Sequence, residues 1–121
     1  MKIGELIYQP EGRRLEFKES IPVVADLART IVAFANDAGG DLYIGIKNDP
    51  RELTGIPEDD LFKMEEQISN IIHDHCYPII IPEISFQSID EKHFYIYKFI
   101  VGAIYPTILS RKGKWMALTF V

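Results

Sequence analysis

The feature that most constrains the fold is an apolar helical stripe that ends at two adjacent glycines and leads directly into a short apolar strand. Residues 23–38 place apolar side chains at the three- and four-residue intervals of an amphipathic helix: Val24, Leu27, Ala28, Ile31, Val32, Phe34 and Ala35. Gly39 and Gly40 follow, and glycine often ends a helix because it adopts the left-handed cap conformation without steric penalty. Residues 41–47 are mostly apolar, as expected of a buried strand. This corner predicts an α/β domain with the helix packed on a sheet.

The rest of the chain supplies the other elements of such a domain. Residues 14–18 alternate polar and apolar side chains, which predicts a short strand. A second helix is expected over residues 57–75, because proline opens it and three acids follow in its first turn. Three further strands are expected over residues 79–87, 93–101 and 115–121. The order β-α-β-α-β-β-β predicts a two-layer α/β sandwich of two helices on a mixed sheet.

Size and composition allow one domain over residues 1–121. The single cysteine excludes an internal disulfide. No apolar run has the length of a signal peptide core or of a membrane span, so we expect a cytoplasmic protein with no membrane partner. The last residues, 119–121, resemble the middle of a strand, so we expect a fragment of a longer protein.

The charge is uneven along the chain. The net charge of −5 argues against a sequence-blind phosphate binder, whose affinity comes from Lys and Arg. Between residues 51 and 75 there are seven acids and two bases, whereas residues 105–121 contain three bases and no acid. A basic surface outside the acidic segment is therefore compatible with the composition.

Several short blocks in order resemble the signatures of the Schlafen-type Alba-like (AlbA_2) family, a DNA-binding family formerly described as divergent AAA ATPases. The blocks are Glu11, residues 16–20, residues 31–40, residues 44–46 and residues 55–56. The resemblance implies an Alba-like fold, a homodimer, and a place at the N-terminus of a transcriptional regulator. The sequence has no P-loop motif, so an ATPase activity is not expected.

The glycine pair has two interpretations. Glycines at a turn can let a phosphate approach the backbone, but these follow the C-terminus of the helix, where carbonyl groups point outward. We therefore expect a structural cap and look for the binding surface elsewhere. An Alba-like domain implies a basic face and an extended hairpin, which selects two groups as the nucleic-acid-binding candidates: Arg13, Arg14 and Lys18, and the loop with Arg111, Lys112 and Lys114. This interpretation makes the domain non-enzymatic and without a cofactor.

Two alternatives remain open. Some animal Schlafen proteins are similar in this region and cut RNA with three acids, and two of these match Glu11 and Glu16, while Asn48 followed by Asp49 takes the third place. Glu11, Glu16 and Asp49 would then bind Mg²⁺ or Mn²⁺ as a metal-dependent nuclease, provided that the first strand lies beside the second. The other alternative is a dimerisation or assembly module, which the acidic net charge favours.

Overall fold

The computed structural model describes residues 3–6, 8–21, 24–77, 81–100, 107–109 and 115–117. Its centre is a four-stranded sheet formed by β1 (Leu15–Lys18), β2 (Gly40–Ile44), β7 (Lys92–Phe99) and β6 (Glu83–Ile89), in that order. Strands β1 and β2 are parallel, with Leu15 opposite Asp41, and the other pairs are antiparallel. The sheet is therefore mixed, and β1 and β6 are its two edges.

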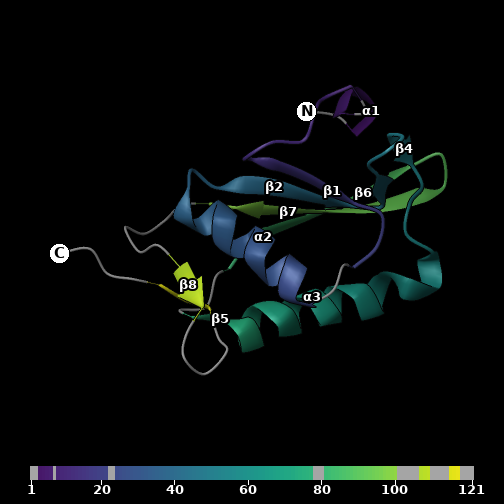
Figure 1. The fold of residues 1–121 in the computed structure, drawn as a ribbon. Helices are drawn as coiled ribbons and strands as arrows, with labels where there is room; N and C mark the ends of the chain where they lie inside the picture. The colour runs from purple at the N-terminus through teal and green to yellow at the C-terminus, as the bar shows by residue number, and fades with distance from the viewer. Residues whose placement is uncertain are drawn as a thin grey trace.

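Two helices cover one face of this sheet (Figure 1). They are α2 (Val24–Asn36) and α3 (Leu61–His75), and α3 is preceded by the 3-10 turn η1 (Glu58–Asp60). The apolar side chains predicted for both helices meet those of β2 and β7 in one buried cluster. Its members include Leu27, Ile31, Phe34, Leu42, Ile44, Ile68, Tyr95, Tyr97 and Phe99. The two-layer α/β sandwich predicted from the sequence is confirmed.

Smaller elements cover the other face. Helix α1 (Ile3–Leu6) and the short strands β3 (Ile46–Lys47) and β4 (Glu52–Leu53) lie on this side (Figure 1). A second buried cluster joins them to the sheet through Ile3, Leu6, Phe17, Tyr43, Ile46, Phe94 and Ile96. Because the N-terminal segment contributes to this cluster, it is part of the packed domain.

A separate three-stranded sheet follows α3. Strand β5 (Cys76–Tyr77) pairs in parallel with β9 (Trp115–Ala117), which pairs antiparallel with β8 (Thr107–Leu109). The sequence predicts β9 as part of a longer strand and does not predict β5 or β8.

The corner at the glycines forms as predicted. The N–H of Gly39 donates to the carbonyl of Phe34 at 3.0 Å, and Gly39 has a φ of 85°, so it caps α2 in the left-handed conformation. The continuous strand predicted over residues 41–47 is wrong, because Gly45 breaks it with a φ of 108° and separates β2 from β3. Within the described residues, no helix has both the length and the apolar character needed to cross a membrane.

Candidate nucleic-acid interface

A polar network fixes the turn that precedes β1. The carboxylate of Glu11 accepts a hydrogen bond from the backbone N–H of Phe17 at 2.8 Å and another from Asn48 Nδ2 at 2.5 Å. The Oδ1 atom of Asn48 accepts in turn from Arg51 Nη2 at 3.0 Å. We call Glu11, Asn48 and Arg51 the Arg51 network. It joins the N-terminal segment to the turn between β3 and β4.

Arg51 is the centre of this network. Its Nη1 donates to the carbonyl oxygens of Leu6, at 3.2 Å, and Gln9. Its guanidinium carbon lies 4.0 Å from the ring centroid of Phe17, a cation–π contact. No local sequence pattern indicates this role, because the two carbonyl partners are 45 and 42 residues away. Arg51 therefore holds the N-terminal segment against the sheet.

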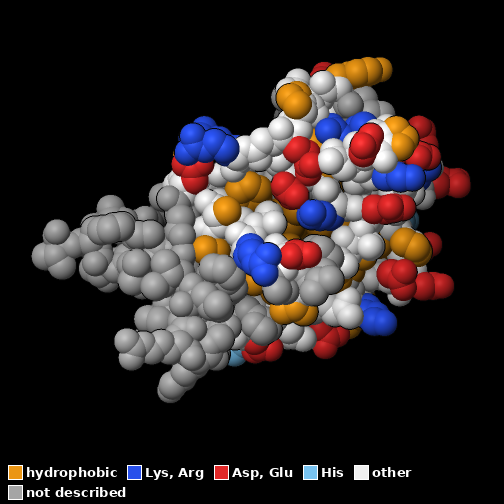
Figure 2. Space-filling view, in the orientation of Figure 1, with side chains coloured by type: hydrophobic (Ala, Val, Ile, Leu, Met, Phe, Trp, Pro, Cys, Tyr) orange, Lys and Arg blue, Asp and Glu red, His pale blue; other side chains and the backbone are white. Residues whose placement is uncertain are grey.

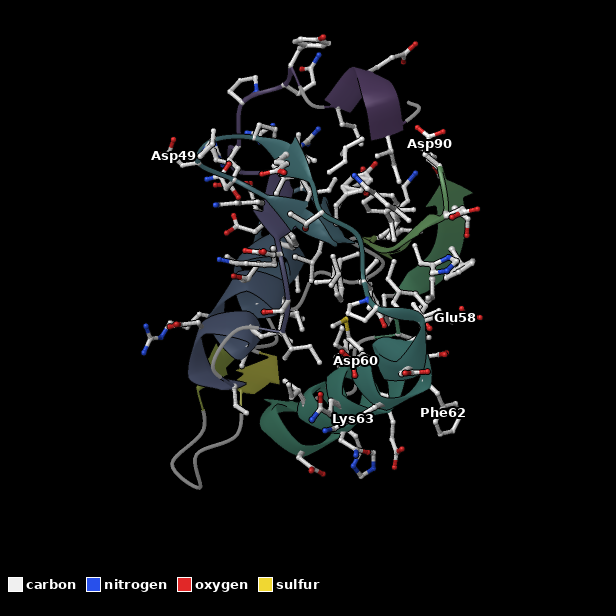
Figure 3. All side chains as sticks on the ribbon, turned by 90° about the vertical axis from the view of Figure 1, so that its right-hand side faces the viewer. Asp49, Glu58, Asp60, Phe62, Lys63 and Asp90 are labelled. Atoms are coloured by element: carbon white, nitrogen blue, oxygen red, sulfur yellow. The ribbon has the colours of Figure 1, made fainter. Side chains whose placement is uncertain are left out.

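The three acids considered as metal ligands are not brought together. One carboxylate oxygen of Glu11 accepts from the Phe17 N–H and the other from the Asn48 amide. Glu16 Oε1 lies 3.1 Å from Lys18 Nζ. Asp49 is at the tip of the turn between β3 and β4, and its side chain points outward (Figure 3). Among the described residues no group of three or more acidic, histidine or cysteine side chains could hold a metal ion. Strand β1 does lie beside β2 as the nuclease alternative requires, but the amide of Asn48 is the group that meets Glu11.

The first basic group lies along the edge strand β1 and the turn before it. Arg13 forms two hydrogen bonds to the Asp37 carboxylate, at 3.0 and 2.7 Å, at the end of α2. The side chain of Arg14 is exposed, while its backbone carbonyl accepts from the N–H of Asp41 at 2.9 Å. Lys18 is paired with Glu16 on the same strand. The structure thus places all three predicted bases on one edge of the sheet.

Each paired base on this edge remains close to solvent. The side chain of Arg13 is 83% exposed and that of Lys18 31%. Lysine and arginine side chains on the visible face lie next to acidic ones, as Figure 2 shows. The exposed pair of Arg13 and Asp37 contributes little to stability, about 0–1 kcal/mol, so an incoming phosphate can replace the Asp37 carboxylate at low cost.

The second basic group, Arg111, Lys112 and Lys114, lies outside the described residues. Its contact with nucleic acid is therefore still a prediction.

The titrating groups with perturbed pKa values are buried tyrosines. Burial raises the pKa of Tyr43, and the nearby Asp41 carboxylate adds to the effect. Burial also raises the pKa values of Tyr95 and Tyr97, with a smaller contribution from the charge of Glu65. Tyr95 donates to the carbonyl of Leu61 at 3.1 Å, whereas the hydroxyl of Tyr97 is buried and has no hydrogen-bond partner among the described residues. None of these tyrosines belongs to the basic edge.

A comparison with known protein families matches this chain to one family. The model of the family described as Schlafen, AlbA_2 matches residues 11–116, which is most of the chain. The chain belongs to the Schlafen AlbA_2 family. The match begins at Glu11, the first member of the Arg51 network, and extends to β9.

Solved structures share the fold of this AlbA_2 domain. One is the N-terminal domain of an ATP-dependent DNA helicase RecG-related protein from Nitrosomonas europaea, with a TM-score of 0.63 and 18% identity over 98% of this chain and 86% of that one. Another is a protein from Corynebacterium diphtheriae, with a TM-score of 0.55 and 15% identity over 86% of this chain and 25% of that one. At these identities the likeness concerns the fold.

A relative of known sequence is an uncharacterized ATP-binding protein from Ureaplasma parvum. It is 32% identical to the AlbA_2 domain over 59 residues, which is 47% of this chain. The match spans 17% of the length of that relative, so this chain corresponds to a small part of it.

Proposed function

We propose that this AlbA_2 domain binds nucleic acid through the edge of β1, with Arg13, Arg14 and Lys18 contacting phosphates. The observation that carries the proposal is the position of these three bases on β1 and the turn before it. Arg14 is exposed and forms no ion pair among the described residues, Arg13 is exposed and paired with Asp37, and Lys18 is half-buried and paired with Glu16. Phosphate contacts supply affinity and orientation without reading the base sequence. Membership in the AlbA_2 family and the fold shared with a domain of a DNA helicase-related protein support the same class of ligand.

The finer form of the proposal is a DNA-binding domain of a transcriptional regulator that acts as a homodimer. A dimer would present the β1 edge twice to a duplex, and this doubles the number of phosphate contacts. The proposal includes no catalytic step, because the carboxylate of Glu11 is occupied by the Phe17 N–H and the Asn48 amide. It also includes no nucleotide hydrolysis, because the sequence has no P-loop.

The test is the salt dependence of binding to a labelled DNA duplex. Three phosphate contacts per protomer predict a slope of log K against log salt of about −2.7, which is roughly a 40-fold loss of affinity between 50 and 200 mM salt. The double variant Arg14→Gln/Lys18→Gln is expected to lower the slope by about 1.8. Light scattering of the same samples gives the number of protomers per complex.

The matched control is Lys63→Gln/Lys98→Gln. It removes the same charge from exposed positions in the acidic half of the chain and is expected to leave the slope unchanged. Absence of binding at 50 mM salt, or equal losses in the two double variants, would contradict the proposal.

A further inference from the structure

Edge strand β6 is apolar on the side of the sheet that carries the helices. Ile84 and Phe86 lie opposite Tyr97 and Tyr95 in the register of β6 and β7, so all four share this face. Tyr95 and Tyr97 are buried, but Ile84 is 44% exposed and Phe86 50% exposed. The helical layer thus leaves the outer strand partly uncovered.

A groove of about 420 Å³ lies between α3 and β6. Residues of the second half of α3 line one wall, and residues at and before the start of β6 line the other: Ser69, Asn70, His73, Ile81, Pro82 and Ile84. Tyr97 also lines the groove, and its buried hydroxyl has no hydrogen-bond partner among the described residues. Because Tyr97 is 0% exposed, it forms the floor beneath the groove, and an occupant would contact the more exposed Ile84 beside it.

The surroundings of the groove are acidic. Residues 51–100 contain ten acids and four bases. Glu65, Glu66 and Asp74 lie one helical turn from Ser69 and Asn70, which line the groove, and all three are exposed. Glu58 and Asp60, in η1 before α3, and Asp90, at the tip of the β6–β7 hairpin, lie at the ends of these elements that are far from the groove (Figure 3). Among the bases of residues 51–100, Lys98 lies nearest to the groove, because it is opposite Glu83 in the register of β6 and β7.

We propose that β6 and this groove bind an extended segment of a partner protein, with alternating apolar residues and basic residues at its ends. An edge strand offers unpaired backbone N–H and C=O groups, and an added strand can pair with them. Every second side chain of the added strand would point toward Ile84, Phe86 and the groove. Basic ends match the acidic side chains of α3, whereas a nucleic acid would meet repulsion there.

The same charges argue against a second copy of this chain as the occupant. Pairing β6 with β6 of another copy would bring two acidic α3 helices together, and like charges at an interface are costly. The β6 surface lies at the edge opposite β1, so its use is independent of the proposed nucleic-acid interface.

The experiment uses a fluorescein-labelled peptide in which valine and threonine alternate over six residues, with two lysines at each end. We expect saturable binding by fluorescence anisotropy and shifts of the amide NMR signals of Ser69, Asn70 and Ile84. Phe86→Lys and Ile84→Lys are each expected to weaken binding at least about tenfold, because they remove an apolar contact and add a charge like that of the peptide.

The control variant is Phe62→Lys, which replaces another exposed aromatic residue, 78% exposed, on α3 but outside the groove lining. It is expected to bind as the wild type does. A peptide with glutamates in place of the lysines should bind at least tenfold more weakly.

Three results would overturn the proposal. They are the absence of binding at 1 mM protein, equal binding of the lysine and glutamate peptides, and light scattering that shows a wild-type dimer converted to a monomer by Phe86→Lys. The last result would assign the surface to a second copy of the chain.

Discussion

At the residue scale, Glu11 acts as a structural acceptor. Its carboxylate satisfies the N–H of Phe17, a residue that is almost completely buried, and the amide of Asn48. We predict that Glu11→Ala lowers the free energy of unfolding by about 1–3 kcal/mol, because both donors lose their acceptor. Urea denaturation followed by circular dichroism measures the change.

The control for Glu11 is Glu19→Ala. Glu19 is exposed, so the expected change is within about 0.5 kcal/mol. If Glu11→Ala left the stability unchanged and abolished a Mn²⁺-dependent cleavage of transfer RNA, the carboxylate would have to be assigned to catalysis.

Tyr95 and Tyr97 make a matched pair of buried tyrosines with different hydrogen bonding. Tyr95→Phe removes a bond to the carbonyl of Leu61 and is expected to cost about 0.5–1.5 kcal/mol at pH 7. Tyr97→Phe removes a hydroxyl without a partner among the described residues, so we expect equal or higher stability. A loss in Tyr97→Phe equal to that in Tyr95→Phe would show that its hydroxyl is bonded in solution.

The same tyrosines predict a loss of stability in alkali. Burial raises the pKa of Tyr97, so the native state keeps its proton at a pH where the unfolded chain has lost it. Below the pKa of tyrosine in the unfolded chain, near 10, Tyr97 does not change how stability depends on pH. Above that pH the free energy of unfolding falls by up to about 1.4 kcal/mol per pH unit. Urea midpoints at pH 9 and pH 11 should therefore fall less in Tyr97→Phe than in the wild type, and an equal fall would contradict the prediction.

At the scale of elements, Gly45 determines where β2 ends. Its φ of 108° is a conformation that residues with a Cβ rarely adopt, and an added Cβ would lie 2.9 Å from the Phe94 ring and 3.2 Å from the His93 carbonyl. We predict that Gly45→Ala costs at least about 1–3 kcal/mol, measured as a lower urea midpoint.

Gly12→Ala is the control for Gly45, because a Cβ at Gly12 would have no neighbour within 4 Å. Its expected effect is within about 0.5 kcal/mol. Equal effects of the two substitutions would mean that the bend at Gly45 is not needed for the fold.

The long elements were predictable from the sequence because their side chains repeat at helical or strand intervals. The break at Gly45 was not, since residues 42–46 are all buried and a continuous apolar run hides a change of direction. Helix α1 and strands β3 and β4 have two to four residues each, too few for a period to be visible. Their positions depend on tertiary contacts, such as those of Arg51 with the carbonyls of Leu6 and Gln9.

At the scale of the whole molecule, the sequence located the bases around β1 relative to one another better than it located the candidate acids; that these bases bind nucleic acid stays a prediction. Arg13, Arg14 and Lys18 are neighbours in the chain, so a single strand and its turn keep them together. Glu11 and Asn48 are 37 residues apart, and their contact depends on the pairing of β1 with β2 and on the direction of the following turn. The sequence pattern was compatible with β1 lying beside β2, but it did not predict whether Asn48 or Asp49 would contact Glu11.

The strand order β1-β2-β7-β6 also sets the separation of the two proposed binding surfaces. Strands β2 and β7 lie between the edges, and neighbouring strands are about 4.8 Å apart, so the two edges are roughly 14 Å apart across the sheet. Macromolecules bound at β1 and at β6 would lie on opposite flanks of one folded domain. The domain would then act as an adaptor that holds the two at a fixed separation.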